Sequence, residues 1–248
     1  MTRMIDVLNR VQKEIGGTNP ATQIVQYGYD INGNRTTTTD PFSRVTTQVF
    51  DALNRVKEIR DPFNGVAAPT KFEYNGLDQL TKVTDPNALD TLYAIDGHGD
   101  TTQLTSPDTG VTTSTFDAAS NLKTKLDARG VLASYSYDAL NRITQIVYPD
   151  ETVTYTYDSC TFGVGRLCSI ADKTGSTVFG YDRWGRVISK SHVIGAVTRT
   201  MGYEYNLQGN LSKVTYPSGR QVVYGYANGR PVSVSVDGLT CPPDFVRT

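Results

Sequence analysis

Tyr137-Asp138-Ala139-Leu140-Asn141-Arg142 and Tyr181-Asp182-Arg183-Trp184-Gly185-Arg186 are two copies of one six-residue motif that recurs along the whole chain. Each copy begins with an aromatic or apolar residue, and most copies continue with aspartate. A repeat of 20 to 24 residues indicates a protein in which one supersecondary unit stacks on the next. The eleven copies begin at Ile5, Tyr29, Phe50, Tyr74, Ile95, Phe116, Tyr137, Tyr157, Tyr181, Tyr205 and Tyr226.

The stretch from Ala133 to Tyr157 illustrates the structure that one copy predicts. Polar and aromatic residues alternate from Ser134 to Tyr137, which is typical of a half-buried β-strand. Asp138 then opens a turn, because an aspartate carboxylate accepts hydrogen bonds from backbone amides two residues further on. We expect a second strand to follow from Arg142 to Val147.

One position of the motif is restricted in type; it comes three residues after the aspartate position in nine copies, one residue earlier in the last copy and later in the Tyr157 copy. It is glycine in six copies, asparagine in three, and aspartate or serine once each, and it is never β-branched or large and apolar. A turn with a positive φ angle at this position explains the restriction. The eleven residues are Asn9, Gly33, Asn54, Asp78, Gly99, Ser120, Asn141, Gly165, Gly185, Gly209 and Gly229.

Proline marks a second turn about ten residues after the first. Because proline fixes φ and cannot donate to a β-ladder, it indicates the opposite rim of a sheet. The sequence therefore predicts an all-β fold, an array of antiparallel β-hairpins whose turns centre near residues 32, 53, 77, 98, 119, 140, 184 and 208. The proline turns are Asp40-Pro41, Asp61-Pro62, Asp85-Pro86, Ser106-Pro107, Tyr148-Pro149 and Tyr216-Pro217.

Two packing arrangements remain open from the sequence. Apolar residues after the first turn often lie three apart, as in Ile143 and Ile146, whereas strict alternation would place such a pair on opposite faces. Either a β-bulge in each hairpin restores one face, or both faces are partly buried. Alternation also places Tyr135 and Tyr137 on one face, which predicts a ladder of aromatic contacts between neighbouring units.

We assign the motif residues a structural role and none of them a catalytic role. Each aspartate recurs in the same turn, so a single capping role explains all of them. The residues with this role are Tyr29, Asp30, Gly33, Asp51, Asn54, Tyr137, Asp138, Asn141, Arg142, Tyr181, Asp182, Gly185, Arg186, Tyr205 and Gly209.

The remaining sequence features give no reason to expect a catalytic centre, a cofactor or a metal. His98 lies in a repeat turn and His192 in a strand or rim loop, and neither has a second histidine or a cysteine at metal-ligand spacing. The net charge of −1 gives no reason to expect nucleic acid as a partner. No apolar run approaches the ~20 residues of a membrane-spanning helix, and the first residues lack the apolar stretch of a signal peptide.

Three cysteines are too few for a disulfide framework, but one local bridge is expected. Cys160 and Cys168 flank an enlarged motif turn, in which six residues instead of two separate Asp158 from Gly165. Strands on either side of a turn can hold β-carbons close enough for a disulfide, so we expect Cys160 to bond to Cys168 and Cys241 to be free. In the alternative, both thiols are free and act as small buried apolar groups.

The recurrent pattern aromatic-Asp-x-x-Gly/Asn-Arg resembles that of the Rhs or YD-repeat proteins, from about Met4 to about Leu239. The resemblance implies a strip of β-hairpins that curves and spirals into a hollow shell around a toxin, as in bacterial polymorphic toxins and insecticidal toxin complexes, or an array like that of the teneurins. The self-cleaving segment of the family, with its Asp-Pro-x-Gly motif, does not occur here, so neither its protease activity nor the toxin is implied.

The expected function is therefore a non-enzymatic wall segment of a YD-repeat shell. Residues 1–239 would form the array, and residues 240–248 a short tail. The resemblance implies two partners, the rest of a longer parent shell and an enclosed toxin domain, in a bacterial protein exported to the outside or to the cell surface. The alternative is an adhesion or carbohydrate-binding module whose tyrosines stack on sugars. Exposed strand edges also predict edge-to-edge self-association.

Overall fold

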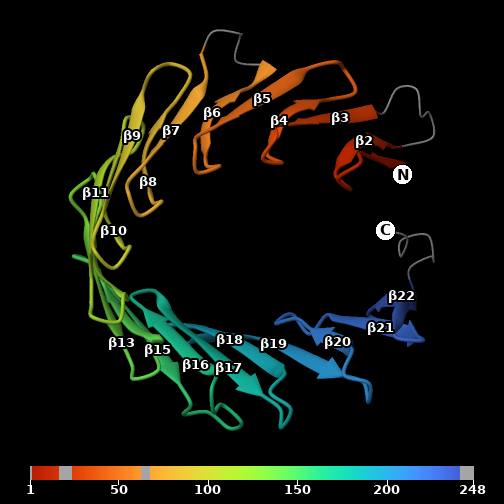
Figure 1. The fold of residues 1–248 in the computed structure, drawn as a ribbon. Helices are drawn as coiled ribbons and strands as arrows, with labels where there is room; N and C mark the ends of the chain where they lie inside the picture. Colours follow the sequence, from red (N-terminus) through yellow and green to blue (C-terminus); the bar gives the residue numbers. More distant parts are fainter. Residues whose placement is uncertain (1, 17–23, 63–67, 241–248) are drawn as a thin grey trace. The chain divides into compact units, whose positions relative to one another are not determined.

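The computed structural model describes residues 2–16, 24–62 and 68–240, and its fold is all-β, as the sequence predicts. The chain forms two compact units, which we call unit 1 (residues 1–130) and unit 2 (residues 131–248). Within each unit, every strand pairs antiparallel with the next strand along the chain (Figure 1). No helix in the described ranges is long and apolar enough to span a membrane.

Unit 1 is a sheet of short strands that lie side by side in chain order, from red to green in Figure 1. The strands are β1 (Thr2–Ile5), β2 (Val11–Ile15), β3 (Ile24–Tyr29), β4 (Arg35–Thr39), β5 (Val45–Phe50), β6 (Val56–Arg60), β7 (Thr70–Tyr74), β8 (Leu80–Thr84), β9 (Asp90–Ile95), β10 (Thr101–Ser106), β11 (Gly110–Phe116) and β12 (Leu122–Leu126).

Unit 2 repeats this arrangement, with two longer strands, β18 and β19, in its middle. Its last strand, β23, ends one residue beyond the array boundary expected from the sequence, and residues 241–248 of the expected tail lie outside the described part of the chain. The strands are β13 (Leu132–Tyr137), β14 (Ile143–Val147), β15 (Thr152–Tyr157), β16 (Leu167–Asp172), β17 (Gly175–Tyr181), β18 (Val187–Ile194), β19 (Val197–Tyr205), β20 (Leu211–Thr215), β21 (Gln221–Ala227), β22 (Arg230–Val236) and β23 (Leu239–Thr240).

The two kinds of turn occupy opposite ends of the strands. Each motif copy begins at or near the end of an odd-numbered strand, and the turn that follows, here called the motif turn, leads into the next strand. The prolines at 41, 86, 107, 149 and 217 lie in turns after even-numbered strands, here called return turns. All the hairpin turns predicted from the sequence are present at the expected positions.

A β-bulge beside each motif turn resolves the three-residue spacing of apolar residues. In the β13–β14 hairpin, Tyr137 lies opposite Ile143, whereas Ser136 lies opposite Gln145, so one residue of β14 has no partner. Because Tyr135 lies opposite Ile146, the bulge brings Ile143 and Ile146 onto the face that carries both tyrosines. The same one-residue shift in pairing register precedes the motif turn in the other hairpins. The hairpins therefore contain a β-bulge and do not alternate strictly.

Two return turns of unit 1 reuse the geometry of the motif turns, a feature that the sequence does not predict. The Asp40 carboxylate accepts hydrogen bonds from the backbone N–H of Phe42 at 2.8 Å and of Arg44 at 3.0 Å. Asp85 caps the turn between β8 and β9 in the same way. Ser43 and Ala88, the third residues after these aspartates, have φ angles of 63° and 62°. One turn design therefore serves both rims of unit 1.

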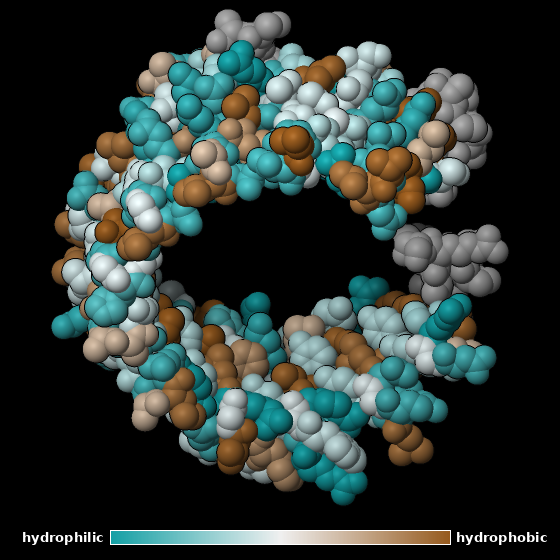
Figure 2. Space-filling view, viewed as in Figure 1, coloured by the Kyte–Doolittle hydropathy of each residue, from teal (hydrophilic) through white to brown (hydrophobic). Residues whose placement is uncertain are grey.

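The sheets have almost no enclosed core. Ala133, Cys168 and Val214 are the buried apolar residues in the described part, with 5%, 3% and 6% of their surface exposed. Apolar and polar residues intermingle over the visible surface (Figure 2). Stability must therefore come from strand pairing, from turn hydrogen bonds and from contacts between neighbouring hairpins.

Candidate functional site: the motif turns and their links

The aspartate of the motif caps its own turn. Oδ1 of Asp138 accepts hydrogen bonds from the backbone N–H of Leu140 at 2.9 Å and of Arg142 at 3.0 Å, and Oδ2 accepts one from Nε of Arg142 at 2.7 Å. The backbone N–H of Arg142, helped by its side chain, lowers the pKa of the Asp138 carboxyl below its ordinary value of 3.8. Equivalent bonds to the second and fourth following residues occur at Asp6, Asp51, Asp96, Asp117 and Asp182, and with an amide oxygen at Asn75 and Asn206.

The restricted third position has a positive φ angle in all eleven copies, between 59° and 94°. At Asn141 φ is 59°, and at Gly185 it is 80°. The N–H of each of these two residues donates to the backbone oxygen of the aspartate that opens its turn. A positive φ is costly for most side chains and mild for glycine and asparagine, which explains the residue types found there.

Arginine and tyrosine link consecutive repeats. The Arg186 guanidinium lies over the ring of Tyr205 in the next copy, 4.5 Å from its centroid, and the Tyr205 hydroxyl donates to the backbone oxygen of Val187 at 2.9 Å. The arginine is itself held by Asp182 at 2.7 Å. This link therefore combines a cation–π contact, an ion pair and a hydrogen bond. All three interactions occur in the pairs Arg10 with Tyr29, Arg55 with Tyr74, and Arg186 with Tyr205. Arg166 with Tyr181 has the arginine–ring contact and the tyrosine hydrogen bond. Arg142 with Tyr157 has the arginine–ring contact and the ion pair.

Polar side chains also join neighbouring motif turns directly. Asn54 accepts hydrogen bonds through Oδ1 from the side-chain amides of Asn32 at 3.0 Å and Asn34 at 2.7 Å. Asn34 in turn donates to the capping carboxylate of Asp30, and the side-chain bond from Asn34 lowers the pKa of that carboxyl. In unit 1 the first, second and third motif turns are therefore connected by arginine–tyrosine and amide contacts.

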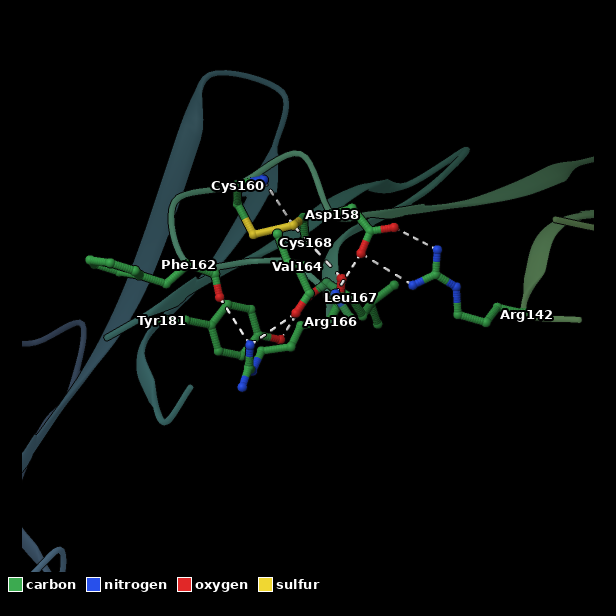
Figure 3. Close-up of a disulfide and its surroundings, with 10 residues drawn as sticks. Arg142, Asp158, Cys160, Phe162, Val164, Arg166, Leu167, Cys168 and Tyr181 are labelled. Atoms are coloured by element: carbon green, nitrogen blue, oxygen red, sulfur yellow. Dashed lines mark hydrogen bonds and ion pairs between the residues drawn. A yellow bond between two sulfur atoms is a disulfide. The ribbon is translucent and has the colours of Figure 1, made fainter. Parts of the chain in front are cut away.

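The enlarged motif turn of unit 2 carries the expected cysteine pair (Figure 3). A disulfide joins Cys160 to Cys168, with their Cα atoms 5.6 Å apart. The Asp158 carboxylate accepts a hydrogen bond from the N–H of Gly165 at 2.6 Å and pairs with both terminal nitrogens of Arg142, at 3.2 and 2.6 Å. The two carboxylates that hold Arg142, Asp158 foremost and then Asp138, raise the pKa of its guanidinium.

The opposite side of the enlarged turn is held by Arg166. Its Nη1 donates to the backbone oxygens of Phe162 at 3.2 Å and Val164 at 3.0 Å, and the guanidinium lies over the ring of Tyr181 (Figure 3). The Tyr181 hydroxyl donates to the backbone oxygen of Leu167 at 2.7 Å. The disulfide, Asp158 and Arg166 thus fix a longer loop in the place of a standard turn. Cys241, expected to be free, lies outside the described residues.

The two histidines occupy exposed positions on separate units. The backbone N–H of His98 donates to Asp96 in a motif turn of unit 1. Nδ1 of His192 lies 3.1 Å from the Thr177 hydroxyl across the β17–β18 pair of unit 2. No group of three histidine, cysteine or carboxylate side chains within the described ranges is arranged to hold a metal ion.

These features agree with the comparisons with known proteins. The family model described as RHS Repeat matches residues 50–89, 116–153, 137–177 and 205–240. The chain therefore belongs to the RHS repeat family. The comparison with curated proteins finds no match to this sequence.

Solved structures share the fold at low sequence identity. A crystal structure of TcdB2-TccC3-Cdc42 is 16% identical and superposes with a TM-score of 0.77, over 96% of this chain and 14% of the matched one. A Photorhabdus luminescens Tc holotoxin pore gives 16% identity and a TM-score of 0.75, again over 96% and 14%. A crystal structure of TcdB2-TccC3 gives 14% identity and a TM-score of 0.69, over 96% and 16%. This chain thus spans less than a fifth of the length of each of these chains.

The arginine–tyrosine links are the main feature that reasoning from the sequence missed. The sequence predicts contacts between the aromatic rings of neighbouring repeats, whereas the contact that recurs between consecutive repeats joins a guanidinium to a ring. A signal was present, because every motif arginine that is followed by another copy precedes a copy that begins with tyrosine. These arginines are Arg10, Arg55, Arg142, Arg166 and Arg186. Of the five copies with another residue at this position, those with Asn34, Gln79 and Asp100 precede Phe50, Ile95 and Phe116, whereas those with Asn121 and Asn210 precede Tyr137 and Tyr226.

Proposed function

We propose that this chain is a non-catalytic wall segment of a longer YD-repeat shell that encloses a protein domain. The observation that supports this most is the use of the motif side chains, which bind their own turn or the neighbouring repeat. Asp138, for example, is engaged by two backbone amides and one guanidinium. A carboxylate held in this way, with a pKa below its ordinary value, is poorly suited to act as a general acid or base near neutral pH.

The architecture supports a wall in a second way. The sheets bury almost no side chains completely, and each described strand pairs with its sequence neighbours within its unit, so a wall of any length can be built by adding repeats. The matched structures belong to chains several times longer than this one. We infer that the partners are further repeats of the same shell and an enclosed toxin-like domain, in a protein that is exported.

Carbohydrate binding is the less favoured alternative. Stacking on a sugar needs a free aromatic face, and the guanidinium groups of Arg10 and Arg186 already lie over the rings of Tyr29 and Tyr205. The hydroxyls of both tyrosines are also used, because each donates to a backbone oxygen of the preceding repeat. Self-association along the sheet edges stays a prediction that light scattering of the purified chain can test.

Limited proteolysis of the complete reading frame that contains this chain tests the enclosure. We expect one domain to resist cleavage until the wall is opened. The double variant Arg142→Ala and Arg186→Ala removes two links between repeats and should expose that domain, whereas Arg199→Ala, an exposed arginine outside these links, should not. Equal cleavage rates in all three proteins would contradict the proposal, as would hydrolytic activity of the purified chain that disappears when one carboxylate or histidine is replaced.

A further inference from the structure

The motif turn at Trp184 differs from the others in unit 2 and forms one side of a groove. The groove has a volume of about 490 Å³ and lies between this turn and the next motif turn, at residues 206–210. Trp184, Arg183 and Arg186 line one side, and Tyr205 and Leu207 line the other. A volume of this size accommodates a few side chains of a bound peptide or a small ligand.

The groove is rich in guanidinium groups and poor in carboxylates. Arg183 and Arg186 lie against the indole of Trp184, with their Cζ atoms 4.1 and 4.7 Å from its centroid. Asp182 neutralises only Arg186, and no carboxylate in the described part of the chain forms an ion pair with Arg183.

The second turn adds no negative charge to the groove. Asn206 replaces the usual capping aspartate there and accepts the amide hydrogen bonds of its turn through Oδ1. Gln208 and Gly209, which also line the groove, are uncharged. The chain as a whole carries a net charge of −1, so this local excess of positive charge is not part of a general basic surface.

Apolar surface accompanies the charge. Trp184 is 62% exposed, and Leu207 has its side chain fully in solvent. Tryptophan, tyrosine and arginine are the residues enriched where protein interfaces concentrate their binding energy. The Asp182–Arg186 pair and the Arg186–Tyr205 contact hold the site in place before any partner binds, which lowers the entropy cost of binding.

We propose that this groove binds a short acidic peptide segment of a partner protein, with a carboxylate at Arg183 and an apolar side chain against Trp184 and Leu207. The proposal does not depend on whether the shell encloses a domain. We expect no such binding at the motif turn of Leu140, where an exposed leucine takes the place of the tryptophan.

Trp184 is the only tryptophan of the chain, so its fluorescence reports on the groove without a label. We would titrate the protein with acetyl-Glu-Glu-Leu-Glu-Glu-amide and with the same peptide carrying glutamine in place of glutamate. The acidic peptide should produce a saturable change in Trp184 emission, and the glutamine peptide should bind at least about tenfold more weakly, as the loss of charge-assisted contacts implies.

Two charge-matched variants locate the effect. Arg183→Gln leaves the Asp182–Arg186 pair intact and should weaken the acidic peptide about tenfold, whereas Arg199→Gln removes the same charge elsewhere in unit 2 and should leave binding unchanged. Trp184→Leu, which imitates the copy at Leu140, should weaken binding when it is measured by anisotropy of a labelled peptide. Equal binding of both peptides, an Arg183→Gln variant that binds like the parent protein, or the same saturation with inorganic phosphate alone would overturn the proposal.

Discussion

Opening the Cys160–Cys168 disulfide should destabilise unit 2 by an amount that the loop length determines. The bridge spans eight positions of sequence, and the loop-closure entropy that it removes from the unfolded chain corresponds to about 2.5 kcal/mol at 25 °C. Reduction of the unsubstituted protein should lower the free energy of unfolding by about this amount. The double variant Cys160→Ala and Cys168→Ala should lower it equally.

The change in melting temperature follows from the size of the unit that unfolds. The entropy of unfolding is about 2.1 cal/mol/K per residue, so 2.5 kcal/mol corresponds to about 10 °C if residues 131–248 unfold on their own. If all 248 residues unfold together, the expected shift is about 5 °C. Calorimetry of the oxidised and reduced protein therefore measures both the bridge and the cooperativity between the two units.

Thiol counting under denaturing, non-reducing conditions provides the decisive control. One reactive thiol, from Cys241, is expected in the oxidised protein, and three are expected after reduction. Three thiols without reduction would show that the bridge does not form in solution. One thiol together with identical melting before and after reduction would instead refute the loop-entropy argument.

Four further predictions concern the turns. Gly209→Ala should cost about 1–2 kcal/mol in urea unfolding, because Gly209 has a φ of 86°. A β-carbon there would make only an ordinary contact, 3.7 Å from Nη1 of Arg186, so the cost comes from the backbone, and Gly209→Asn should cost less because asparagine fills this position in other copies. Asp138→Ala with Asp182→Ala should lower the melting temperature through unsatisfied turn amides; an unchanged value would contradict the capping role. Since the folded-state pKa of Asp138 is lowered, its stabilisation is present above pH 3.8 and is lost as the pH falls through the lower folded value, so Asp138→Asn should flatten acid unfolding curves. A β-carbon at Gly163 would overlap both disulfide sulfurs, so Gly163→Ala should leave more free thiol after air oxidation.

The local structure was predictable because each motif residue acts within its own turn. Asn141 and Gly185 share a position at which only a positive φ explains the residue types, and both adopt that angle. Ser43 and Ala88 show the limit of this reasoning, because they adopt the same angle although neither residue type signals it. Their turns are instead fixed by the preceding aspartates, whose carboxylates bind the turn amides.

Contacts that depend on register between strands were not predictable from one copy. The bulge at Tyr137 was one of two alternatives, because apolar residues three positions apart fit either a bulge or two partly buried faces. Only the pairing of Tyr137 with Ile143 decides between them. The link from Arg186 to Tyr205 joins residues of consecutive repeats and depends on how closely two hairpins approach. The groove at Trp184 likewise depends on the spacing of adjacent turns, which a motif does not encode.

Pairing between neighbouring strands has a consequence for how such a chain can change in length. Deleting β17 and β18 together would remove one complete period and let β16 meet β19 with the same polarity, so every later motif would stay on its original side. Deleting β18 alone would move all later motif turns to the opposite ends of the strands. The link between Arg166 and Tyr181 would then be separated from the links of the later repeats. Gene duplications and losses should therefore be tolerated in steps of two strands, and single-strand indels should be purged. The same locality lets folding begin at any hairpin and spread outward along the chain.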